Sequence, residues 1–81
     1  MSWENEARRI VRAELVRRGV TYERLAKKLQ DIGIAETKPS IANKMSRGTF
    51  SFIFFLQVMR ALDVQLVTLD LGEQAERKKD D

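Results

Sequence analysis

The stretch that decides the fold is residues 37–48, TKPSIANKMSRG. Pro39 suits the first turn of a helix, where its missing N–H group removes no hydrogen bond. Apolar residues then recur at helical spacing on one narrow stripe, and Gly48 follows as a residue that readily ends a helix by adopting positive φ. The stretch therefore predicts a short helix over residues 39–47, with a polar and cationic outer face.

Two further helices are predicted before this one, over residues 3–18 and from Thr21 to about Asp31. In both, apolar residues recur at the i, i+3, i+4 and i+7 spacing of an amphipathic helix. Ser2 and Thr21 are expected to cap these helices, because a hydroxyl oxygen at that position accepts from a free N–H group of the first turn.

Residues 52–62, FIFFLQVMRAL, predict a fourth helix that is apolar over most of its circumference. Its expected core stripe consists of Phe52, Phe55, Leu56, Met59 and Leu62. The apolar residues outside that stripe are Ile53, Phe54 and Val58. Because an 81-residue monomer offers little to cover them, we expect these three to face a second copy of the chain. The alternative is that the helix over residues 3–18 covers them.

Residues 64–71, VQLVTLDL, fit either a strand or a helix. Their β-branched side chains favour a strand. A lone strand is not stable in water, so we expect this one to pair with its own copy across a two-fold axis. The residues expected in that dimer interface are Leu66, Val67 and Leu69.

The composition excludes several classes of function. The chain contains no Cys and no His, which excludes disulfides, zinc fingers and Cys–His or Ser–His catalysis. An apolar fraction of 43% suits a folded chain, and we expect one domain over residues 1–72 followed by a charged, flexible tail over residues 73–81. Its carboxylates are expected to be solvated, so we predict neither an enzyme nor a cofactor nor a metal site.

The net charge of +3 is concentrated in the middle of the sequence. Residues 1–7 carry −2, residues 8–47 carry +7 and residues 48–81 carry −2. Such a basic block suits a surface that faces a polyanion, although Arg and Lys can also simply solvate helix faces. The sequence has no apolar run long enough to span a bilayer and no signal-peptide pattern at its start, which predicts a cytoplasmic protein with no membrane partner.

The order of these elements resembles the lambda-repressor-like helix-turn-helix superfamily. TYERLAKKL at residues 21–29 resembles the first helix of a helix-turn-helix unit, SIANKMSRG at residues 40–48 its recognition helix, and FLQVMRALDV at residues 55–64 the helix that follows. Within the superfamily, the chain is most similar to a bacterial group of small uncharacterised domains. That group shares the patterns GVTYxxLA and IANKxSRGTF, found here at residues 19–26 and 41–50.

The resemblance implies a mainly α, four-helix domain whose third helix lies in the major groove of double-stranded DNA. It places Ser40, Asn43 and Lys44 against base edges. The residues implied to hold phosphates are Thr37, Lys38, Arg47 and Thr49, helped by Arg24, Lys27 or Lys28. These residue types suit the roles, because Asn bonds an adenine edge twice, Lys donates to guanine, and Arg and Lys neutralise phosphates.

Other interpretations stay open at this point. Asn43 can form bonds within its own helix, and Arg47 can bond the carbonyl groups at the helix end. The spacing between the second and third helices exceeds that of a compact helix-turn-helix by about six residues, and Asp31 and Glu36 place negative charge near the expected DNA face. We therefore expect a dimeric, sequence-preferring transcriptional regulator, with an antitoxin-like or scaffold module for protein interaction as the alternative.

Overall fold

The computed structural model describes residues 2–71, which contain four α-helices. The helices are α1 (Trp3–Arg18), α2 (Tyr22–Asp31), α3 (Lys38–Arg47) and α4 (Phe52–Ala61). All eight helix ends lie within one residue of the predicted positions, so the prediction of four helices is confirmed. Within the described residues, no helix is both long enough and apolar enough to cross a membrane. The predicted tail over residues 73–81 lies outside the described residues.

A hydroxyl group caps the first turn of every helix. The capping side chains accept from the backbone N–H group three residues further on, and they belong to Ser2, Thr21, Thr37 and Ser51. At the other end, α1 and α3 stop at Gly19 and Gly48, whose φ angles are 65° and 71°. This left-handed conformation strains residues that carry a Cβ atom. The local sequence therefore sets where the helices begin and where two of them end.

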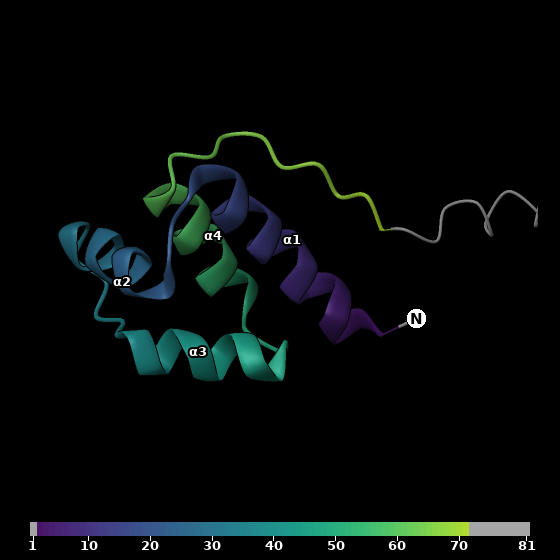
Figure 1. The fold of residues 1–81 in the computed structure, drawn as a ribbon, viewed down its shortest axis with the longest axis horizontal. Coiled ribbons are helices and arrows are strands. Elements are labelled where there is room, and N and C mark those ends of the chain that lie inside the picture. The colour runs from purple at the N-terminus through teal and green to yellow at the C-terminus, as the bar shows by residue number, and fades with distance from the viewer. Residues whose placement is uncertain (1, 72–81) are drawn as a thin grey trace, which may run out of the picture.

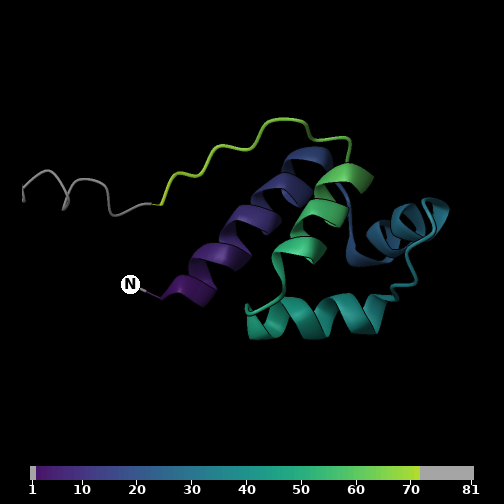
Figure 2. The ribbon, with the colours of Figure 1, turned by 180° about the vertical axis from the view of Figure 1, so that it is seen from behind.

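The four helices enclose one apolar core. Helix α2 packs against both α3 and α4. Helix α1 lies beside α4, and α3 runs across the end of this pair at which both helices begin (Figures 1 and 2). The buried apolar residues are Val11, Leu15, Leu25, Ala26, Leu29, Ile41, Met45, Phe54, Val58, Met59 and Leu62. Every helix contributes to this set, so the core holds all four in one unit.

The inward face of α4 differs from the predicted one. Phe54 and Val58 are 2% and 0% exposed, whereas the predicted core residues Phe52 and Leu56 are 69% and 52% exposed. Because one chain already encloses Phe54 and Val58, they are core residues rather than the dimer-interface residues that the sequence predicts. Spacing alone does not determine which side of this helix turns inward, since apolar residues occupy nearly its whole circumference.

Residues 64–71 do not form the predicted strand. The segment is extended, but it is paired with no strand in the part of the chain that the structure describes. The described part of one chain offers no second strand to satisfy its N–H and C=O groups. After Asp63, whose φ is 60°, the segment instead turns back along α1 (Figure 1). Val67 packs against the core there, while Leu66 and Leu69 stay exposed.

Helix α1 is tied to the end of α3. The Nη1 atom of Arg8 donates to the carbonyl oxygen of Ser46 at 2.7 Å, where the negative end of the α3 dipole favours a cation. Gly48 lies directly against Glu4, and a Cβ atom at Gly48 would be 2.8 Å from the carbonyl oxygen of Glu4. Gly48 is therefore required both for its positive φ and for this close approach.

Candidate nucleic-acid interface

Helix α3 presents a polar outer face. Its inward side is fixed by Ile41 and Met45, both buried in the core. Asn43 and Arg47 lie four residues apart, and therefore on one face, and both are exposed. Among residues 2–71, neither side chain takes part in a hydrogen bond or an ion pair. Asn43 therefore makes no bond within its own helix there, and Arg47 makes none to the carbonyl groups at the helix end. Both side chains are available to a partner.

Two of the three residues predicted to contact bases are engaged by Glu36 instead. The Nζ atom of Lys44 lies 3.2 and 3.1 Å from the two carboxylate oxygens of Glu36 and 5.3 Å from the ring centroid of Phe54. The Oγ atom of Ser40 donates to Glu36 Oε1 at 2.6 Å. Of the predicted base contacts, Asn43 alone keeps its polar atoms free of the described chain.

Glu36 does not place an exposed negative charge beside α3. It is one of the two charged residues buried in the described chain, and Lys44 compensates its charge. The Nε2 atom of Gln30 donates to the Glu36 carbonyl oxygen at 2.8 Å, and the Ile34 N–H donates to the Leu29 carbonyl at 2.9 Å. The long connection over residues 32–37 is therefore held in place at both ends.

The remaining predicted phosphate contacts divide between the two helices. Lys38, the first residue of α3, and Thr49, which follows its end, are exposed. Arg24 and Lys27 are exposed on α2, the helix packed against α3. Lys28 is partly buried. The Thr37 hydroxyl caps α3 as half of a capping box with Ser40. This bond reduces the capacity of the hydroxyl to form hydrogen bonds with a ligand.

A second surface feature is apolar. Phe52, Ile53 and Leu56 are exposed on the outer side of α4, and we call them the α4 apolar face. Ile53, at 67% exposed, is the residue of this face that the sequence also predicts to contact a second copy. Exposed apolar residues that lie together on one helix mark interaction surfaces more often than scattered ones do.

Lys44→Met is expected to lower the free energy of unfolding by about 1–2 kcal/mol, because it leaves the buried Glu36 carboxylate without its cation. The expected loss stays below that of a fully buried pair because the Lys44 side chain is 39% exposed and partly screened by solvent. Urea denaturation measures the effect. Lys38→Met removes an exposed charge from the same helix and should change the value by less than about 0.5 kcal/mol. Equal losses in both variants would show that the ion pair does not stabilise α3.

These features define a small four-helix domain that presents one polar, cationic helix face and one apolar helix face. The family described as "Domain of unknown function (DUF6471)" matches residues 3–67, and the chain belongs to this family. No curated protein and no solved structure matches the chain.

Proposed function

We propose that the chain is a sequence-preferring, double-stranded-DNA-binding transcriptional regulator of the lambda-repressor-like type, which acts as a dimer with α3 in the major groove. The observation that carries this proposal is the outer face of α3. There the Asn43 amide and the Arg47 guanidinium are exposed and unused by the described chain, while Ile41 and Met45 hold the helix from behind. A rigidly supported helix with free donors suits direct contact with base edges.

In this proposal the residues of α3 and those that flank it have three different roles. Asn43 bonds a base edge, and the exposed Lys38, Arg47 and Thr49 contact phosphates. The helix packed against α3 adds further phosphate contacts from Arg24, Lys27 and Lys28. Ser40, Lys44 and Thr37 position α3 rather than contact DNA, since Glu36 and the helix cap engage them.

Charge supports the same class of partner. The block over residues 8–47 carries +7, and its acidic member closest in sequence to α3, Glu36, is compensated by Lys44. Phosphate contacts by such a surface release counterions, so binding should weaken steeply as salt is added.

Selection of bound sequences from random duplexes, followed by fluorescence anisotropy at two salt concentrations, tests the proposal. Asn43→Ala is expected to reduce discrimination at one base pair by about 1–3 kcal/mol. Arg47→Ala is expected to weaken binding to all sequences alike and to lower the magnitude of the salt slope by about one. The two variants therefore separate base recognition from phosphate binding.

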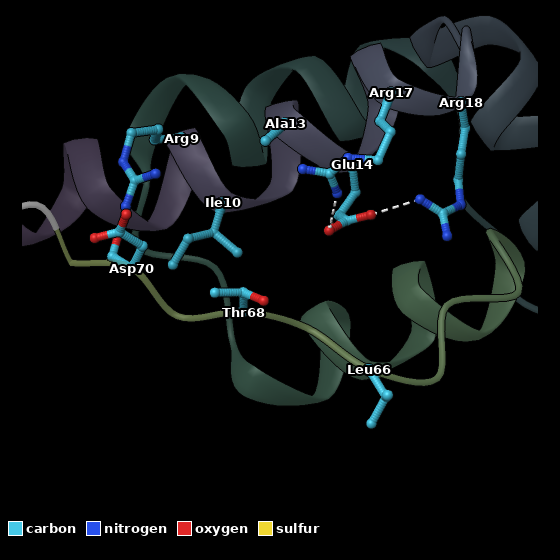
Figure 3. A pocket seen from close by; sticks show the side chains of 9 residues that line it. All are labelled: Arg9, Ile10, Ala13, Glu14, Arg17, Arg18, Leu66, Thr68 and Asp70. Carbon is cyan, nitrogen blue, oxygen red and sulfur yellow. Dashed lines mark hydrogen bonds and ion pairs between the residues drawn. The ribbon is translucent and has the colours of Figure 1, made fainter.

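Arg17→Ala is the matched control for Arg47→Ala. It also removes one arginine, but one that lines a cleft between α1 and residues 66–70 (Figure 3), and that segment lies on the opposite side of the helices from α3 (Figure 1). We expect it to leave DNA affinity within about twofold, because exposed charges far from the contact are screened. Enrichment of no sequence, or equal losses in the Arg17 and Arg47 variants, would contradict the proposal.

A second candidate function is a protein-interaction or oligomerisation module. The observation that favours it is the α4 apolar face, since Phe52, Ile53 and Leu56 are all exposed on one helix. Light scattering during size-exclusion chromatography, with and without duplex DNA, distinguishes the two functions. A higher oligomer that does not bind DNA would favour this second candidate over the first.

A further inference from the structure

A cleft of about 470 Å³ lies between α1 and the extended segment over residues 66–70. Three arginine side chains, those of Arg9, Arg17 and Arg18, line it from α1, and Thr68 lines it from the segment (Figure 3). Neither the proposed DNA contacts nor the α4 apolar face uses any of these residues.

Glu14 organises one end of this cleft. Its side chain is 8% exposed, and its two oxygens accept separately from Arg17 Nη1 and Arg18 Nη1, each at 2.6 Å. Arg18 also donates through Nε to the carbonyl oxygen of Leu62 at 3.3 Å. One carboxylate thus fixes two guanidinium groups, and within this cluster of three side chains one positive charge has no counterion.

Both guanidinium groups keep hydrogen-bond donors for a ligand. An arginine carries five N–H donors, and the bonds within the described residues engage one on Arg17 and two on Arg18. Planar guanidinium groups bind carboxylate and phosphate oxygens through paired hydrogen bonds, which gives both charge and geometric selectivity. This end of the cleft is therefore preorganised for an oxyanion.

The other end is closed by Arg9. Its guanidinium pairs with Glu6 Oε1 at 2.8 Å and donates to the carbonyl oxygen of Asp70, which holds the segment against α1. Arg9 thus joins the two walls of the cleft. These bonds engage three of the five N–H donors of Arg9, against one on Arg17 and two on Arg18. Most of the free donors therefore lie at the Arg17–Arg18 end, and Ile10 and Ala13 line the cleft between the two ends (Figure 3).

We infer that this cleft binds a small oxyanion, carboxylate or phosphate, through the N–H donors of Arg17 and Arg18 that Glu14 and the Leu62 carbonyl leave unused. The extended segment lies on the opposite side of the helices from α3 (Figures 1 and 2). DNA held on α3 therefore does not supply the oxyanion, and the cleft volume of about 470 Å³ suits a free small molecule. Its binding would also hold residues 66–70 against α1, because the segment forms one wall of the cleft.

Titration of the ¹⁵N-labelled chain with inorganic phosphate, with citrate and with chloride at matched ionic strength tests this inference by NMR. We expect saturable shifts of the Glu14, Arg17 and Thr68 amide signals with phosphate or citrate, and none with chloride. Arg17→Ala should weaken the binding by about fivefold or more, the effect of a charge-assisted pair reduced by solvent exposure. Arg12→Ala removes an exposed arginine of α1 that does not line the cleft, and it should change the affinity by less than about twofold.

Several outcomes would overturn the inference. They are unsaturable shifts that chloride reproduces, equal weakening by the Arg12 and Arg17 variants, or displacement of bound phosphate by a DNA duplex. The proposed DNA function is tested separately by the same proteins. If both ideas hold, Asn43→Ala combined with Arg47→Ala loses DNA binding and keeps phosphate binding, whereas Arg17→Ala does the reverse.

Discussion

Gly48→Ala is expected to lower the free energy of unfolding by about 2–5 kcal/mol. The φ of 71° at Gly48 places a residue with a Cβ atom in the left-handed region, which costs about 1–2 kcal/mol. The added Cβ atom would also lie 2.8 Å from the Glu4 carbonyl oxygen. Since that oxygen belongs to the backbone of α1, no side-chain rotation relieves the contact, and overpacking of this kind adds about 1–3 kcal/mol.

Gly19→Ala separates the two causes. Gly19 has nearly the same φ, 65°, but a Cβ atom there would meet nothing within 4 Å. Gly19→Ala should therefore lower the free energy of unfolding only through the strained backbone conformation, by about 1–2 kcal/mol. Urea denaturation of both variants gives the comparison. Equal losses would mean that the packing of α1 against the end of α3 does not constrain Gly48.

Ile53→Glu combined with Leu56→Glu is expected to raise the dissociation constant of the proposed dimer by at least about a hundredfold. Each substitution occurs twice in a two-fold dimer, so four carboxylates would enter an apolar contact. Both side chains are exposed in the single chain. The free energy of unfolding of the monomer should therefore change by no more than about 0.5 kcal/mol for each.

Val16→Glu is the control for the dimer prediction. Val16 is 79% exposed and apolar, but it lies on α1 rather than on the α4 apolar face. It should leave self-association unchanged. Sedimentation equilibrium measures all the variants, and a wild-type chain that stays monomeric throughout the micromolar range would contradict the proposed dimer.

The helices could be predicted because their ends are determined locally. Ser2 and Thr21 cap the helices that they precede, as predicted, and Gly48 ends α3. Each of these signals acts within one helical turn, so it survives in the sequence without knowledge of the fold. The recurrence of apolar residues at helical spacing then identifies the inward side of α2 and α3, because the outer faces of these helices are polar.

The orientation of α4 and the state of residues 64–71 could not be predicted in the same way. Phe54 rather than Phe52 turns inward, where its ring contacts Phe50 of the preceding loop and Lys44 of α3. These partners lie outside α4, so the spacing within α4 does not reveal them. The tendency of residues 64–71 to form a strand is a local preference. It is realised only when a partner strand exists, and the described chain provides none.

Part of the candidate site was accessible to sequence reasoning. The exposed positions of Asn43 and Arg47 follow from helical spacing opposite Ile41 and Met45. The engagement of Lys44 does not follow, because Glu36 precedes the helix and its burial depends on tertiary packing. The available signal was the four-residue spacing of Glu36, Ser40 and Lys44, which places all three along one side of a helix and its first turn.

The bond from Arg8 to the Ser46 carbonyl joins residues that lie 38 positions apart in the chain. Loosening the first turns of α1 would therefore remove a contact that holds the last turn of α3, and we expect the two segments to open together. Under the proposed function, a change at α1 would therefore affect DNA binding by α3. A partner that displaced α1 would alter the helix that contacts DNA without touching it.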